Sequence, residues 1–161
     1  MIDRLIFVLT LVSAVGSGLI GGVFFAFSAF VMKALSRLPA PHGIAAMQSI
    51  NVAVLNRLFF AVFFGTAAGC ILLAVRSVLM WNTRGAGYLF VGCALYLVGT
   101  ILVTIFFNVP LNNALAVVDP TSADGARLWT DYLTSWTIWN HVRTIAALAA
   151  AASLTIAFRL D

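Results

Sequence analysis

The chain has 161 residues, of which 63% are apolar and only 9% charged, and its mean hydropathy is +1.08. An ordinary soluble domain has about 25% charged residues, so this composition excludes a soluble globular protein. A membrane span needs about 20 apolar residues, and the length therefore allows four spans with their connections. The formal net charge of +4 comes without a basic cluster, which argues against a nucleic-acid partner.

The first predicted span covers residues 5–32, and its polar members are Thr10, Ser13, Ser17 and Ser28. The opening residues resemble a signal peptide, but the apolar run continues well beyond any cleavage point. We therefore predict an uncleaved helix. Two prolines in residues 33–43 end this helix and form a connection.

The second and third spans are predicted over residues 57–76 and 86–108. Helical spacing already begins at Ile44, so the second helix is expected to stand beyond the membrane before it enters the membrane at Arg57. The third helix is expected to continue past the membrane, to bend at Pro110 and to stop before Asp119.

The fourth helix is predicted over residues 127–161, where only residues 144–158 are uninterrupted apolar sequence. Fifteen residues are too few to cross a bilayer, so the span must begin near residue 136 and take polar side chains into its outer part. The predicted fold is a single all-α domain over residues 1–161. It is a bundle of four transmembrane helices, of which the second and fourth extend beyond the membrane on one face.

Four spans place both termini on one membrane face. The arginines of that face are Arg4, Arg76, Arg84 and Arg159, and the opposite face carries Lys33, Arg37 and Arg127. Because basic residues favour the cytoplasmic side, this distribution predicts cytoplasmic termini. We expect the protein in the bacterial inner membrane.

Polar side chains gather at the other face. Arg57 begins the second span, and Asn108 and Asn112 end the third, four residues apart. In the fourth helix, Trp129, Trp136, Asn140 and Arg143 are separated by seven, four and three residues and form one stripe. Facing lipid, this stripe would leave a guanidinium and an amide in hydrocarbon, so we predict that it faces the bundle interior. Interhelical hydrogen bonding without any ligand is the alternative for Arg57, Asn51 and Asn112.

Metal sites have little support in the sequence. The chain has no Glu, which excludes a Glu-x-x-His di-iron site, and Cys70 and Cys93 lie in apolar runs as buried hydrophobes. One alternative stays open, in which His42 and His141 together hold haem or a metal ion.

Two segments carry a resemblance to a known family. The stretch TIFFNVPLNNAL, which ends the third span, and WTDYLTSWTIWNHVRT, which enters the fourth, resemble the small four-helix membrane proteins of the anthrone oxygenase family. The stretch GGVFFAFSAFVMKAL extends this resemblance to the first helix. The resemblance implies signature positions at Asn108, Pro110, Asn112, Trp129, Trp136, Asn140 and Arg143. It also implies oxygenation of a tricyclic anthrone to an anthraquinone, without metal or organic cofactor.

An anthrone is acidic at the carbon between its rings, so an enzyme must remove that proton and stabilise the carbanion. Neutral His141 is the predicted base, and Arg143 and Arg57 are predicted to stabilise the enolate oxygen. The amides are expected to bind phenol and carbonyl groups, and the tryptophans to stack on the planar ligand. The predicted catalytic residues are His141, Arg143, Asn140 and Asn108. The predicted substrate-binding residues are Arg57, Asn112, Trp136, Trp139 and Phe27.

The leading hypothesis is thus a cofactor-independent oxygenase or oxidase of a hydrophobic phenolic or polycyclic substrate. Its partners would be that small molecule, dioxygen and membrane lipid. A non-catalytic binding or carrier protein and a structural membrane subunit are the alternatives. A homo-oligomer also stays open, although the small residues at positions 146–153 favour packing within the bundle.

Overall fold

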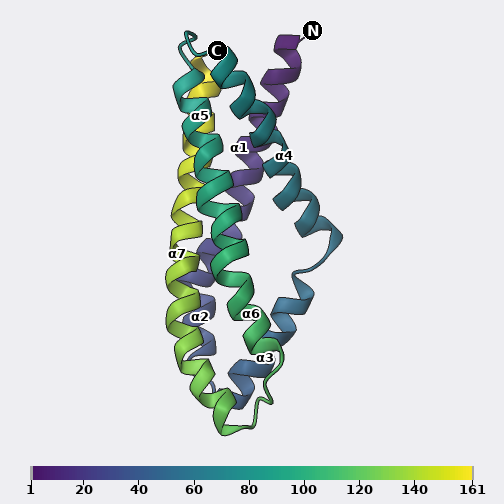
Figure 1. Ribbon diagram of the computed structural model, residues 1–161, viewed down its shortest axis with the longest axis vertical. Helices are drawn as coiled ribbons and strands as arrows, with labels where there is room; N and C mark the ends of the chain where they lie inside the picture. Colours follow the sequence, from purple (N-terminus) through teal and green to yellow (C-terminus); the bar gives the residue numbers. More distant parts are fainter. Residues whose placement is uncertain (1, 161) are drawn as a thin grey trace.

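The computed structural model describes residues 2–160, and helices make up nearly all of this part of the chain (Figure 1). The first helical stretch consists of α1 (Ile2–Ala26), η1 (Phe27–Val31) and α2 (Met32–Leu35). It is followed by α3 (Ala40–Ala53) and α4 (Arg57–Leu79). The third stretch consists of α5 (Ala86–Ala94), η2 (Leu95–Leu102), η3 (Thr104–Asn108) and α6 (Val109–Ala116), and α7 (Ala123–Leu160) ends the chain. The three η segments are π-helical.

Four helical stretches are long and apolar enough to cross a membrane, namely Arg4–Leu35, Arg57–Leu79, Ala86–Ala116 and Ala123–Leu160. The predicted all-α architecture with four spans is therefore confirmed. Both chain ends lie at one end of the bundle in Figure 1, and α3 lies at the opposite end together with the connection between α6 and α7.

The prediction of one continuous second helix was wrong, because the chain breaks between α3 and α4. Asn56 has an extended backbone at the break, and its side-chain oxygen accepts a hydrogen bond from the backbone N–H of Phe59 at 3.0 Å. Asn is a strong N-cap, which explains why α4 begins at Arg57. The separate α3 packs beside the end of α6, where the Gln48 amide donates to the carbonyls of Leu115 and Val118 at 2.9 and 3.1 Å. These bonds satisfy carbonyls that the end of α6 would otherwise leave unpaired.

The connection before α7 is a hydrogen-bonded turn. The Asp119 carboxylate accepts bonds from the backbone N–H and the hydroxyl of Thr121, both at 2.8 Å, and these bonds hold the pKa of Asp119 below its usual value. The Ser122 hydroxyl then accepts from the backbone N–H of Gly125 at 3.0 Å. This capping interaction explains why α7 begins at Ala123, four residues before the predicted start.

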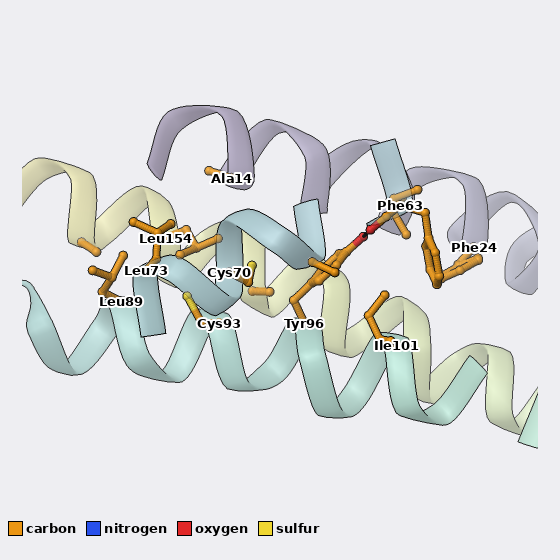
Figure 2. Close-up of a cluster of buried hydrophobic side chains, with 14 residues drawn as sticks. Ala14, Phe24, Phe63, Cys70, Leu73, Leu89, Cys93, Tyr96, Ile101 and Leu154 are labelled. Atoms are coloured by element: carbon orange, nitrogen blue, oxygen red, sulfur yellow. Dashed lines mark hydrogen bonds between the residues drawn. The ribbon is translucent and has the colours of Figure 1, made fainter. Parts of the chain in front are cut away.

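Two apolar cores fill the bundle. The core near the termini joins α1, α4, α5, η2 and α7, and contains the buried Cys70 and Cys93 (Figure 2). Tyr96 lies wholly inside it and donates its hydroxyl to the carbonyl of Phe63 at 3.0 Å. The second core surrounds α3 and the first half of α7, and consists of Met32, Leu35, Ile44, Met47, Leu115, Trp129, Tyr132 and Trp136. Along α7, Asn140 and Arg143 separate the two cores.

The topology predicts labelling from opposite sides of the membrane. Asn82 lies in the connection between α4 and α5, Ala123 begins α7, and both are exposed. An impermeant thiol reagent on intact cells should label Ala123→Cys, and should label Asn82→Cys only after permeabilisation, if the termini are cytoplasmic. The native cysteines are buried and give little background. Labelling of both positions from the same side would contradict the four-span topology.

Candidate functional site

A cavity of about 180 Å³ lies between the two cores, enclosed by α1, η1, α3, α4, η3, α6 and α7. Its walls are largely aromatic, and the rings come from Phe24, Phe27, Phe59, Phe60, Phe63, Phe64 and Trp136. The polar lining residues are Asn51, Thr104, Asn112 and Arg143. Apolar walls with a few placed polar groups are typical of small-molecule sites. A larger groove of about 640 Å³ near the termini includes none of these residues.

Arg143 is the charged residue of this cavity, and only 4% of it is exposed. Its guanidinium donates to the Asn140 side-chain oxygen at 2.7 Å and to the Thr104 hydroxyl at 3.2 Å. The guanidinium carbon lies 4.1 Å from the ring centre of Phe24 and 5.1 Å from that of Trp136. Its Nε atom is buried without a partner in the described part of the chain.

No carboxylate neutralises this charge among the described side chains, whose one ion pair joins Arg127 and Asp124 at the surface. Cation–π contacts contribute about 0.5–2 kcal/mol each, which offsets only part of the cost of burying a guanidinium. An uncompensated charge inside a membrane bundle is rare and typical of functional sites.

Asn140 holds the guanidinium from behind the cavity. Its amide nitrogen donates to the Phe24 carbonyl and to the Ser28 hydroxyl, both at 2.8 Å, while its oxygen accepts from Arg143. Ser28 lies in η1, and π-helical turns leave carbonyls free for such contacts. Asn108, at the end of η3, donates to the Trp136 carbonyl at 3.1 Å and fixes the third span to α7.

Asn112 fixes the aromatic wall. Its side-chain oxygen accepts hydrogen bonds from the Trp136 indole N–H at 2.7 Å and from the Tyr132 hydroxyl at 2.8 Å. The rings of Trp129, Tyr132 and Trp136 stack successively along α7. These contacts fix the orientation of Trp136, the ring of this stack that lines the cavity.

The sequence model of the anthrone oxygenase family matches residues 56–153, from the cap of α4 through most of α7. The chain belongs to the anthrone oxygenase family. No curated protein and no solved structure shows a significant match to the chain. The match includes Thr104, Asn112, Trp136 and Arg143 of the cavity, whereas the walls formed by α1 and α3 lie outside it.

Four of the predicted site residues line the cavity of this anthrone oxygenase family member: Arg143, Asn112, Trp136 and Phe27. Asn108 and Asn140 are fully buried behind it, and the prediction that the polar stripe faces the interior is met. Arg57 does not line the cavity. It is the first residue of α4, and it is exposed.

Trp139 and His141 were also expected at the ligand, and the structure corrects both placements. Trp139 stacks on Phe107, with ring centres 3.6 Å apart, and does not line the cavity. His141 is exposed, and its Nδ1 lies 2.9 Å from the Ser28 hydroxyl. Successive residues of a helix are rotated by about 100° around its axis. Trp139 and His141, which flank Asn140 in the sequence, therefore lie on other sides of α7 than Asn140 and Arg143. A direct role for His141 as the base is not supported by this geometry.

Of the cavity residues, the prediction missed Thr104 and did not include Asn51 among the site residues, although Asn51 was considered for interhelical hydrogen bonding. Thr104 lies four residues before Asn108 on the same helical face, which could have indicated it. Asn51 belongs to α3, where Met47, Ile50 and Asn51 line the cavity at helical spacing, and Val54 lines it just after the helix ends. The helical periodicity of this segment was visible in the sequence. The orientation of α3 as a separate helix was not, because the break before α4 was not predicted.

The two histidines do not form a shared haem or metal site. His42 is exposed next to Gly43, which packs against Trp129. Trp129 and His141 are twelve residues apart on α7, which is about 18 Å along the helix. In the described part of the chain, no three His, Cys, Asp or Glu side chains cluster as metal ligands would.

Proposed function

We propose that this protein is an integral membrane oxygenase that oxidises a hydrophobic phenolic or polycyclic substrate with dioxygen in the cavity at Arg143. The observation that carries the proposal is the buried guanidinium without a carboxylate partner, set among aromatic rings that suit a planar ligand. Membership of the anthrone oxygenase family supports the reaction class. We place the protein in the bacterial inner membrane with cytoplasmic termini.

For an anthrone, the reaction converts the central CH₂ group into a carbonyl. Its two C–H bonds break, one atom of dioxygen becomes the carbonyl oxygen, and the other leaves as water with the two hydrogens. The substrate supplies all four electrons, so the balance needs no further reductant. Arg143 stabilises the enolate oxygen that forms when the first proton leaves.

Among the described residues, neither an imidazole nor a carboxylate lines the cavity. The positive charge of Arg143 lowers the pKa of a bound acidic substrate, so that water at the nearby membrane face can take the proton. We assign His141 an indirect role, in which it orients Ser28 and, through Ser28, Asn140.

This assignment predicts a small effect of His141→Ala. Removal of a general base typically lowers a rate by about 10²- to 10⁴-fold, whereas loss of this indirect contact should lower it by less than about tenfold. Steady-state oxidation rates of the two proteins test the difference. A loss of 100-fold or more in correctly folded His141→Ala would restore His141 as the base.

A non-catalytic carrier is the second candidate, and the lack of a base in the cavity wall favours it. The cavity is also smaller than the roughly 300–1,000 Å³ of sites that enclose a whole drug-sized ligand, so a tricycle would be only partly enclosed. A carrier would bind the ligand without consuming oxygen.

Oxygen uptake by the purified protein in nanodiscs distinguishes the two functions. With 1,8-dihydroxyanthrone, an oxygenase should consume one dioxygen for each anthraquinone formed, faster than empty nanodiscs in which the anthrone oxidises by itself. Binding without faster uptake would indicate the carrier. The absorption spectrum of the same preparation checks for haem and flavin, and a Soret band would contradict oxidation without a cofactor.

A further inference from the structure

We infer that the cavity selects the ionised form of its ligand, with Arg143 and Asn51 as the two donors of an oxyanion site. The ligand class is a planar amphiphile with one acidic oxygen, such as a phenol or enol, that reaches the cavity from the bilayer. The inference rests on the proposed function for its choice of ligand, but ligand ionisation is measurable without turnover.

Arg143 has donor capacity to spare in the cavity. Two of its nitrogens bind neutral oxygens, those of Asn140 and Thr104, and its Nε is buried without a partner. A ligand oxyanion would supply the counter-charge that the described residues lack. Because removing a charge from water is costly until it is paired, the apo cavity favours an anion over a neutral molecule of the same shape.

Asn51 provides a second unused donor in the same cavity. Its amide nitrogen is buried and makes no hydrogen bond in the described chain, where its nearest polar neighbour across the cavity wall is the Tyr132 hydroxyl, which donates to Asn112. Asn112, the other amide of the cavity wall, already has two hydrogen bonds, which its side-chain oxygen accepts. Buried donors are nearly always paired, so an orphan donor on a cavity wall indicates a ligand acceptor.

Arg143 is the one charged side chain among the described residues that line the cavity. The lining residues of α1, η1, α3, α4, η3 and α6 include no ionisable side chain. On α7, the neighbouring titratable groups are Tyr132, which donates its hydroxyl to Asn112, and His141, which is exposed beside Ser28. Arg143 therefore sets the sign of the field in the cavity.

The rim of the cavity is apolar and exposed. It includes Leu55 in the connection before α4, Phe60 and Phe64 in the first turns of α4, and Ile105 and Val109 on the third span. Figure 1 shows the junction of α3 and α4 standing away from α6 on this side. A neutral, lipid-soluble phenol can pass this rim and lose its proton inside. Selective binding of the ionised form then appears as a lowered pKa of the bound phenol.

The test uses 2-hydroxyanthraquinone, whose visible absorption moves to longer wavelength when its phenol ionises. The probe is titrated with pH in phosphatidylcholine nanodiscs that hold wild-type protein or no protein. We expect the protein to favour the ionised form at least tenfold, which lowers the phenol pKa by about one. Arg143→Met should abolish this change, and Arg37→Gln, which removes an exposed arginine of the first connection, should leave it intact.

A matched pair at Thr104 keeps the test independent of folding defects at Arg143. Thr104→Asp brings a carboxylate to the guanidinium and should abolish selection of the anion, whereas the similarly shaped Thr104→Asn should retain it. Asn51→Leu should reduce the preference severalfold, with Asn113→Leu at an exposed position of α6 as its control. Each variant must still bind neutral anthraquinone, which reports an intact cavity, and the two control variants should bind it as the wild type does.

An unchanged or raised phenol pKa with wild-type protein, a lowered pKa that survives in Arg143→Met, or no binding of the probe would each overturn the inference. Oxygen uptake tests the proposed function separately from the pKa measurement. A lowered pKa without oxygen uptake on 1,8-dihydroxyanthrone would leave an anion-binding carrier. Oxygen uptake without a lowered pKa would retain the oxygenase, but it would exclude selection of the ionised ligand and the proposed effect of Arg143 on the substrate pKa.

Discussion

Arg143→Met is expected to lower the rate of anthrone oxidation by about 10²- to 10³-fold, the usual effect of removing one donor that stabilises a developing oxyanion. Methionine keeps an unbranched apolar side chain beside Phe24 and Trp136, the rings that the guanidinium now contacts, but removes the charge. Replacing a buried charge with an apolar side chain of similar volume is often neutral for stability. The loss should therefore be in activity and not in folded yield.

The measurement is the initial rate of anthraquinone formation in nanodiscs, corrected for oxidation without protein. Arg143→Lys keeps a charge but lacks the planar fork of donors, and should recover only part of the rate. Arg37→Gln serves as the exposed control. Wild-type activity in folded Arg143→Met would remove the guanidinium from the mechanism and with it the observation on which the proposed function rests.

The fold was predictable because its strongest signals are long apolar runs, which a bilayer turns directly into spans. The fourth span shows how far this reasoning extends. Its apolar run is too short, so polar residues had to enter the bundle, and their spacing placed Asn140 and Arg143 inside. The same stripe excludes His141 and Trp139, which were assigned by chemical type and not by helical face.

Local backbone geometry limited the rest of the prediction. Asn56 could be recognised as an N-cap, but in an apolar context it was taken for a residue inside a helix. Missing that break concealed the independent helix α3 and thereby the place of Asn51 in the cavity wall. The π-helical segments that hold Ser28, Thr104 and Asn108 shift the phase of side chains, and hydrophobic periodicity does not indicate where such a shift occurs.

Asn140→Leu is expected to cause a large loss of stability, of about 2–4 kcal/mol, since each buried group left unpaired costs about 1–3 kcal/mol. Interhelical hydrogen bonds in membrane proteins average only about 0.6 kcal/mol, but Asn140 differs from the average case. It joins α7 to the Phe24 carbonyl and to Ser28, and it also holds the uncompensated charge of Arg143. Leucine would leave that carbonyl and one face of the guanidinium without partners.

Thermal unfolding in nanodiscs measures this loss, with Asn113→Leu as the exposed control. A double variant identifies its cause. If most of the cost comes from the stranded guanidinium, Asn140→Leu combined with Arg143→Met should be more stable than Asn140→Leu alone, because the charge that needed a partner is gone. If the cost comes instead from the bonds to Phe24 and Ser28, the second substitution should restore nothing. Recovery of stability without recovery of activity would show that Asn140 positions Arg143. It would also show that the buried charge serves the ligand although it lowers the stability of the protein.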